Sequence, residues 1–348
     1  MLRQKDVTIN INRAAVATNV GTWMPLIFAG KNTSAIAYTV CRSLEDVIIT
    51  VGGITPSDTE QQKATKTAAA KATGIYKAAQ LMLMQNDAPA EFAICASTAV
   101  TTTGIVDVLA REWRQLIVVS IGVTGEDTAK AISDYIETTD KLFFVSATST
   151  SGVTSTNERT IWVVHDDVND VEHPESAVVG ATAGKPAGSI NYKNMEVRGL
   201  TPPDITDAQL DAIRAVNGIA LIYRSGKVVT SDGKTASGEY IDILDGIDFV
   251  VQGITNETEA FLISADKVKY DNTGIAQLEN ICYDVLSQAA SQDIIAIDDN
   301  VPQFTVDYKP RSETRQADRA ARRYVEGNFT FSLAGAIDTV VVNGTVEI

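Results

Sequence analysis

Three short apolar runs decide the fold: residues 91–97 (Glu-Phe-Ala-Ile-Cys-Ala-Ser), 116–121 (Leu-Ile-Val-Val-Ser-Ile) and 142–147 (Leu-Phe-Phe-Val-Ser-Ala). Each run is short and apolar on both faces, which is typical of a strand buried inside a parallel sheet. Segments with apolar residues at helical spacing separate them, at residues 105–113 and 129–136. Strands that alternate with helices predict an α/β domain, with a central, mostly parallel sheet and helices on both faces.

The same pattern extends in both directions from these runs. Residues 37–51 and 161–165 are strand-like, and residues 219–230 hold two strand-like pieces around Ser225-Gly226. We predict helices at the segments with helical spacing or a good N-cap, which are residues 59–84, 174–183, 206 onward, 240–263 and 275–289. Period-two alternation predicts strands at residues 7–12, 303–309 and 328–333, and Asn343-Gly344 indicates a terminal hairpin. The last quarter therefore reads as a smaller α+β region.

The overall charge limits the kinds of partner that the protein binds. The chain of 348 residues has 44 acidic and 29 basic side chains, a formal net charge of −15. Nucleic acids and anionic membrane surfaces are bound through Lys and Arg, so both are poor partners for this chain. Residues 1–6 lack the apolar core of a signal peptide, and no run of about 18 apolar residues predicts a membrane span.

The cysteines and histidines indicate little chemistry. Cys41, Cys95 and Cys282 are far apart and odd in number, so we expect buried thiols and neither a disulfide framework nor a zinc site. His165 and His173 lie beside a group of acidic residues, Asp166, Asp167, Asp170, Glu172 and Glu175. A metal site there is conceivable, but its spacing matches no standard metal motif, and a solvated acidic loop is the preferred interpretation.

No catalytic or cofactor motif stands out. The stretch from Gly180 to Pro186 (Gly-Ala-Thr-Ala-Gly-Lys-Pro) has three residues between its glycines where a phosphate-binding loop has four, and Pro186 replaces the magnesium-binding hydroxyl. GxGxxG and GxSxG are absent. We expect no cofactor, although an α/β hydrolase that uses Asp166 or Asp167 with His165 stays open as an alternative.

Residues 309–323 form a basic segment in an otherwise acidic chain. Its local charge of +4 leaves −19 for all other residues. At 100° per residue, a helix here would carry its arginines on one face and small or aromatic residues opposite. The first group is Arg315, Arg319, Arg322 and Arg323, and the second is Ala317, Ala320, Ala321 and Tyr324. The arginine face is either solvated, with intramolecular ion pairs, or it binds an acidic partner, because guanidinium groups suit carboxylates.

The two ends of the chain are candidates for strand exchange. Residues 7–12 and 338–348 are both β-rich and terminal. Such strands either pair within their own chain, which is commoner, or add to an open sheet edge of another copy. Exchange between copies predicts a linked polymer, and contacts that do not close produce filaments or tubes.

Several motifs resemble the contractile tail sheath proteins of phages and R-type bacteriocins. They are Pro174-Glu-Ser-Ala-Val-Val-Gly-Ala, Gly188-Ser, Leu200-Thr-Pro-Pro, Asp318-Arg-Ala-Ala-Arg322, and Phe329 and Phe331 followed by Ala334-Gly-Ala-Ile337. The resemblance runs from about residue 160 to the end and includes the N-terminal strand. It implies a subtilisin-like fold without a catalytic triad, and a non-enzymatic subunit that polymerises around an inner tube and contracts to drive it through a cell envelope.

The resemblance also implies a division of the chain and roles for particular residues. Residues 1–22 and 337–348 would be arms, 23–270 an α/β sheath domain, and 271–336 a smaller domain facing the tube. Strand-arm residues would be Val7, Ile9, Ile11, Val340, Val342 and Val346, and tube-facing residues Arg315, Arg319, Arg322 and Arg323. The implied partners are further copies of the chain, the tube protein, the baseplate and the tail terminator or collar. The implied location is a phage tail or tail-like particle, made in a bacterial cytoplasm and released on lysis. A different filament or shell subunit is a further alternative.

Overall fold

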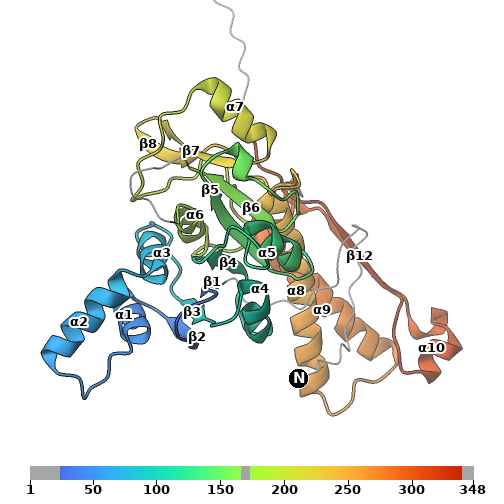
Figure 1. Ribbon diagram of the computed structural model, residues 1–348. Helices are drawn as coiled ribbons and strands as arrows, with labels where there is room; N and C mark the ends of the chain where they lie inside the picture. The colour runs from blue at the N-terminus through green and yellow to red at the C-terminus, as the bar shows by residue number, and fades with distance from the viewer. Residues whose placement is uncertain (1–23, 166–172, 339–348) are drawn as a thin grey trace, which may run out of the picture. The chain divides into compact units, whose positions relative to one another are not determined.

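The computed structural model describes residues 24–165 and 173–338 (Figure 1). The chain divides into two compact units, one ending at Leu244 and the other starting at Asp245. The helix α8 (Ile241–Ser264) begins in the first unit and continues in the second. The predicted boundaries at residues 22, 270 and 336 stay a prediction.

A mixed sheet of eight strands forms the first unit, in the order β2-β3-β1-β4-β5-β6-β7-β8. The six strands from β3 to β7 in this order are parallel, and the outer strands β2 and β8 are antiparallel to their neighbours. The strands are β1 (Pro25–Ala29), β2 (Ile36–Cys41), β3 (Phe92–Ala96), β4 (Gln115–Val118), β5 (Leu142–Ala147), β6 (Thr160–Val164), β7 (Ile219–Arg224) and β8 (Lys227–Thr230). The predicted mostly parallel sheet is confirmed.

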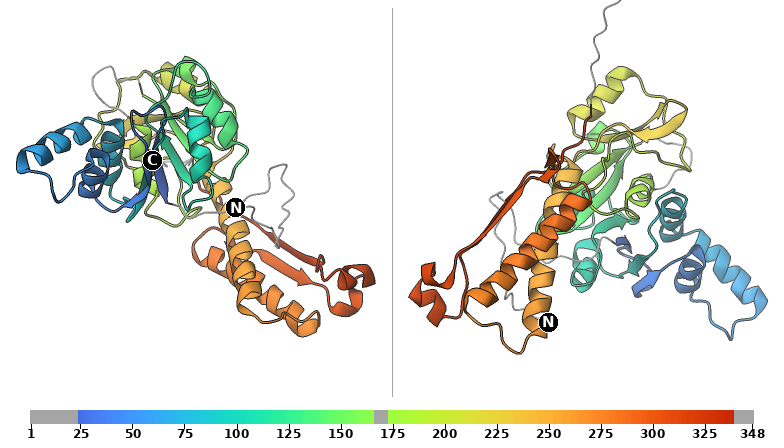
Figure 2. Two further views of the ribbon diagram at one scale, coloured as in Figure 1. Left: turned by 60° about the horizontal axis from the view of Figure 1, so that its bottom comes forward. Right: turned by 180° about the vertical axis from the view of Figure 1, so that it is seen from behind.

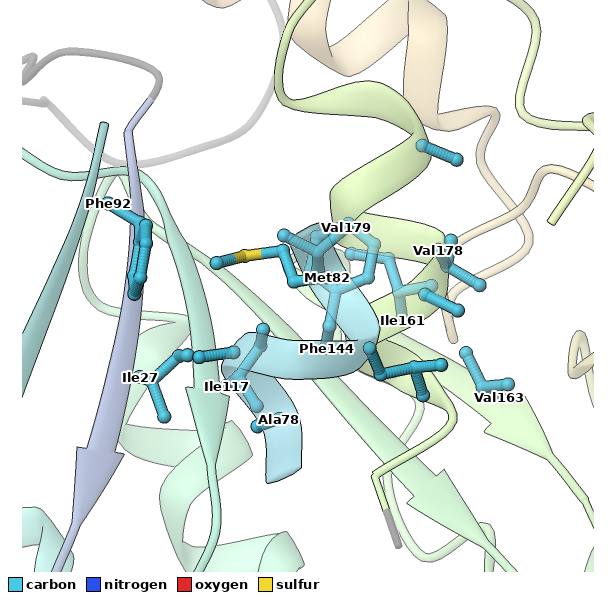
Figure 3. Close-up of a cluster of buried hydrophobic side chains, with 14 of the residues drawn as sticks. Ile27, Ala78, Met82, Phe92, Ile117, Phe144, Ile161, Val163, Val178 and Val179 are labelled. Atoms are coloured by element: carbon cyan, nitrogen blue, oxygen red, sulfur yellow. The ribbon is translucent and has the colours of Figure 1, made fainter. Parts of the chain in front are cut away.

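Alternate residues of the central strands belong to two separate hydrophobic cores. Ile117 and Phe144 belong to the core under α1 (Leu44–Gly52), α3 (Gly74–Leu83) and α6 (Glu175–Thr182). Leu116 and Phe143 belong to the opposite core, under α5 (Ala129–Ile136) and the 3-10 turn Ile105–Val108. Figure 3 shows side chains of α3 and α6 against those of the strands in the first core. Helices therefore cover both faces, as the continuous apolar runs predicted.

Residues 44–52, predicted as strand, form the helix α1 instead. The Ser43 hydroxyl accepts a hydrogen bond from Asp46 N–H, and the Asp46 carboxylate accepts one from Ser43 N–H, which makes a capping box. Gly53 ends the helix in the left-handed conformation. Val47 is buried and Val51 packs against the first core, so capping and packing outweigh the β-propensity of the branched residues.

The predicted helix at residues 59–84 is two helices, α2 (Glu60–Lys71) and α3. Thr73 interrupts it, because its hydroxyl accepts a hydrogen bond from Tyr76 N–H and thereby caps a new helix. Only α3 carries a buried stripe, whereas Ala64 and Ala68 on α2 are exposed. A single amphipathic face over 59–84 was therefore the wrong interpretation.

The helix that the apolar spacing predicts at residues 105–113 is also wrong. The chain forms only the short helix α4 (Thr101–Gly104) and the 3-10 turn that follows it. Trp113 lies beyond both, fully buried, with its indole N–H donating to the Val108 carbonyl at 2.7 Å. Trp113 is apolar because it is buried in a loop, and its position happens to match the spacing of a helix. The predicted helices α5, α6 and α7 (Asp207–Ala215) and the β7–β8 hairpin are confirmed.

The second unit is built on the rest of α8 and on α9 (Asn272–Ser291), both of which were predicted. The two helices approach closely where Gly253 faces Val285, because a Cβ atom at Gly253 would lie 2.7 Å from Val285 Cγ1. Two short strands, β9 (Ile297–Asp298) and β10 (Val301–Pro302), form a small hairpin. β11 (Phe304–Tyr308) and β12 (Gly327–Phe331) form a second two-stranded sheet (Figure 2).

Candidate assembly surfaces

The β11–β12 sheet has one apolar and one polar face. Phe304, Val306, Tyr308, Phe329 and Phe331 pack against the core of α8 and α9. On the opposite face Thr305 and Thr330 share a hydrogen bond of 2.6 Å, and Asp307 and Asn328 are exposed. The alternation predicted at residues 303–309 and 328–333 is thus confirmed as a half-buried sheet.

Among the described residues, β11 and β12 each have an outer edge without a paired strand, although just past β12 Leu333 forms an antiparallel bridge with Ile295. Lys309 N–H donates to the Glu326 carbonyl at 3.3 Å, and Ser332 N–H donates to the Gln303 carbonyl at 2.9 Å. Hydrogen-bonded pairs alternate along an antiparallel ladder, so residues 304, 306 and 308 of β11 point their backbone groups away from β12. Within residues 24–165 and 173–338, no strand pairs with the outer edge of β11 or of β12.

The basic segment 309–323 connects the two strands but is not one amphipathic helix. It contains a 3-10 turn at Arg311–Glu313 and the short helix α10 (Gln316–Ala320). The helix ends because Arg322 adopts φ 56°, and the N–H groups of Arg322 and Arg323 donate to the carbonyls of Arg319 and Asp318. These bonds form a Schellman motif. The predicted single arginine face is therefore wrong, and local backbone geometry at the helix end is the reason.

The four arginines of the predicted tube-facing set differ in their surroundings. Arg319 Nη1 donates to the carbonyls of Arg311 and Thr314, so it braces the turn before α10. Arg323 forms an ion pair of 2.9 Å with the buried carboxylate of Asp318. Arg315 and Arg322 are exposed, and neither has an ion-pair partner in the described part of the chain. Two arginines therefore support the segment and two are available to a partner.

Three tyrosines fix the base of the basic segment. Tyr308 and Tyr324 stack with ring centroids 5.7 Å apart, and Tyr270 meets Tyr324 edge-on at 6.1 Å. The Tyr324 hydroxyl donates to the Lys309 carbonyl, and Lys309 forms an ion pair of 2.9 Å with Glu326. Burial raises the pKa of Tyr324 to about 12, so its hydroxyl remains a donor at ordinary pH. The two ends of the segment are thus held together.

Nothing in the described residues tests the predicted arms. Residues 7–12 and 339–348, with the six strand-arm positions named above, lie outside them. Residues 334–337 (Ala-Gly-Ala-Ile), close to the end of the described range, are exposed, and Ile337 is 81% exposed.

The histidines do not form a metal centre with described residues. His165 is buried, with Nε2 3.1 Å from the Thr201 carbonyl oxygen. His173 Nδ1 lies 3.1 Å from the Glu175 carboxylate. Residues 166–172, which include Asp166 and Asp167, lie outside the described ranges. Among the residues that are described, no group of three or more His, Cys, Asp or Glu side chains has the arrangement of a metal site.

The stretch from Gly180 to Pro186 has a packing role. Gly180 lies inside α6, where a Cβ atom would stand 2.2 Å from the Met82 carbonyl oxygen of α3. Gly184 N–H donates to the Asp87 carbonyl at 3.0 Å, and Lys185 pairs with the Asp87 carboxylate. The glycines therefore permit close helix packing, and the stretch ends a helix, whereas a phosphate loop precedes one.

The three cysteines are buried free thiols, as predicted. Burial raises the pKa of Cys41 and of Cys282 to about 11, which keeps both thiols protonated and unreactive at neutral pH.

Sequence reasoning missed three features of this region: the open β11 edge, the tyrosine contacts and the helix end at Arg322. Strand alternation located β11 and β12 but says nothing about which backbone groups stay free. A glycine or asparagine at position 322 would have indicated the helix end, because these residues favour the left-handed conformation. Arginine gives no such indication.

Comparison with known proteins finds matches at the level of structure alone. No protein-family model matches the sequence, and no curated protein does either. A chain of the anti-feeding prophage baseplate matches with a TM-score of 0.69 and 13% identity, covering all of both chains. The contracted helical sheath of the same particle gives 0.64 and 11%, again over all of both chains. The contracted sheath of an extracellular contractile injection system, PVC, gives 0.65 and 9%, covering all of this chain and 99% of the other.

These matched chains belong to structural assemblies of phage-tail-like particles. A sheath tail protein from Listeria innocua matches at a TM-score of 0.56 and 9% identity, over 92% of this chain and 97% of that one. In the described part of the chain, no helix is long and apolar enough to cross a bilayer. The described part of the protein therefore has the fold of these sheath and baseplate chains of contractile particles.

Proposed function

We propose that the protein is a structural subunit of a contractile tail sheath, which polymerises around an inner tube and contracts to drive the tube through a target envelope. The observation that carries this proposal is the match of fold to chains of contracted sheaths, which covers 99–100% of the length of each compared chain. A match of this extent includes the small second unit, where assembly contacts are expected.

Strand exchange through the β11–β12 sheet would link the subunits. Among residues 24–165 and 173–338, no strand pairs with its outer edges, and its apolar face lies against α8 and α9. An added strand with the alternation of residues 7–12 would place Val7, Ile9 and Ile11 on the apolar face and its polar residues on the other. The same holds for Val340, Val342 and Val346 of the C-terminal arm.

The basic segment is the proposed contact with the inner tube. Its charge has the sign opposite to the rest of the chain, and Arg315 and Arg322 are exposed without an ion-pair partner among described residues. The other proposed partners are the baseplate and the terminator or collar. We include in the proposal the subtilisin-like description of the fold, the absence of catalysis and cofactor, and synthesis in a bacterial cytoplasm followed by release on lysis.

The hydrolase alternative has less support. The matched chains are parts of contractile particles, and His165 is buried against the Thr201 carbonyl. A hydrolytic activity that disappears on His165→Ala would favour the enzyme.

Electron microscopy of the purified protein, with and without tube protein, tests the proposal. We expect sheath-like tubes from the full chain, and folded but unlinked monomers after deletion of residues 1–12, because the strand that joins copies is lost. A matched control replaces Thr8 and Asn10 with other polar residues and keeps the three apolar positions. Monomers alone under all conditions would overturn the sheath proposal, and unchanged polymerisation of the deletion variant would overturn arm exchange.

A further inference from the structure

Four helices end in the same hydrogen-bonded motif, and one of them uses an unsuitable residue. Schellman bonds close α1, α7, α9 and α10, with left-handed residues Gly53, Asn217, Asp293 and Arg322. Gly, Asn and Asp tolerate this conformation because glycine lacks a Cβ atom and the other two have short polar side chains. Arginine has neither property, so its backbone is strained at position 322.

No intramolecular contact in the described residues explains why an arginine occupies this position. Lys31 is also left-handed, but its ammonium group forms an ion pair of 2.6 Å with Asp127. The Arg322 side chain is exposed and has no such partner within residues 24–165 and 173–338. Strained residues without a local reason concentrate at functional sites, where the surroundings hold the strain in place.

The surroundings of Arg322 do hold it in place. The Arg323 guanidinium binds Asp318 at 2.9 Å, so an ion pair joins the two ends of the motif where an apolar contact is usual. Arg319 braces the preceding turn through the carbonyls of Arg311 and Thr314. The hydroxyl of Tyr270 donates to the Arg323 carbonyl at 3.3 Å and ties the motif to the tyrosine cluster. Arg322 is therefore presented from a rigid platform.

We propose that Arg322 is the specificity-determining residue of the tube contact, and that it binds a carboxylate pair on the inner tube together with Arg315. Arg319 and Arg323 are positioning residues that act through the backbone at Arg322. This inference rests on the proposed sheath function and deepens it. A guanidinium group forms two parallel bonds to a carboxylate, and a fixed backbone reduces the conformational entropy lost on binding. Charge complementarity identifies the partner surface as acidic.

The variant Arg322→Gly separates the effect of residue 322 on backbone strain from its effect on tube binding. Arg322→Gly relieves the backbone strain, so the thermal midpoint of the monomer should stay the same or rise. The same substitution should weaken co-sedimentation with purified inner tubes of the source particle by about tenfold, the effect of one charged hydrogen bond. Arg322→Lys keeps the charge without the fork, and should bind with intermediate affinity. Asp293→Gly, which relieves the corresponding position after α9, is the matched control and should leave tube binding unchanged.

Each outcome decides the proposal. Wild-type tube binding by Arg322→Gly would overturn it and leave Arg322 as a helix cap only. Loss of sheath self-association by Arg322→Gly without tubes would also overturn it, because the partner would then be a second copy of the chain. If the wild-type protein forms no sheath and binds no tube, the proposed function itself fails, and this inference fails with it. An Arg322→Gly variant that is at least as stable as the wild type and assembles, but binds tubes poorly, would support this inference.

Discussion

At the residue scale, glycines and arginines of this protein have roles that depend on what lies next to them in space. Gly180 and Gly184 looked like parts of a degenerate phosphate loop, but they lie against the carbonyls of Met82 and Asp87. The four arginines predicted on one face divide into Arg319 and Arg323, whose side chains bond within the segment, and Arg315 and Arg322, whose side chains have no ion-pair partner among the described residues. The sequence shows which residue stands at each of these positions, but it does not show which atoms lie next to that residue in space.

Gly180→Ala tests the packing role of this glycine. Alanine in a helix interior is favoured by about 1 kcal/mol over glycine. Here its Cβ would stand 2.2 Å from a backbone oxygen that cannot rotate away, and overpacking costs roughly 1–3 kcal/mol. We therefore expect a lower urea midpoint for the variant. Gly335→Ala is the control, because nothing lies within 4 Å of its added Cβ. Equal stability of the two variants would contradict a close α3–α6 contact.

At the element scale, most strands and helices followed from periodicity, and the errors came from local endings. The buried strands β3 to β6, the helices α5 to α9 and the β11–β12 pair were predicted within a few residues. The helix α1 differs from the predicted strand because its β-branched residues favour a strand, whereas its capping box favours a helix. The interruptions at Thr73 and Arg322 were missed because each depends on hydrogen bonds with nearby backbone groups.

A pair of proline variants tests the open edge of β11. The N–H of residue 306 points away from β12, whereas the N–H of residue 305 points toward it, by the alternation of the ladder. Val306→Pro should therefore leave the monomer folded but prevent an arm from pairing, so no linked sheath forms. Thr305→Pro should unfold the small sheet itself. Circular dichroism of the monomer and electron microscopy of the assembly distinguish these outcomes. Normal sheaths from Val306→Pro would place the arm elsewhere.

At the scale of the whole molecule, the charge of the chain is unevenly distributed. The net charge is −15, with +4 concentrated in residues 309–323. Like charges repel between copies, whereas the basic segment attracts an acidic partner. Self-association and tube attachment should therefore respond to salt in opposite directions.

This contrast is measurable on the assembled particle. Raising the ionic strength from about 0.01 to 0.15 M shortens the screening length from roughly 30 to 8 Å. Sheath self-association should then become stronger because repulsion between copies is screened. Binding of the sheath subunit to purified tubes should become weaker over the same range. Light scattering follows the first process and co-sedimentation the second. A tube affinity that does not change with salt would argue against the basic segment as the contact.

The α/β class, the two-sided burial of the central sheet and the segregation of positive charge follow from the amino-acid sequence, because periodicity and composition are properties of the chain alone. Only the three-dimensional arrangement of the described residues establishes which glycines meet a carbonyl, which arginines lack an ion-pair partner there and which edge of β11 has no paired strand there. These depend on atoms far apart in sequence or on a single backbone angle, such as φ 56° at Arg322, that the residue type does not favour.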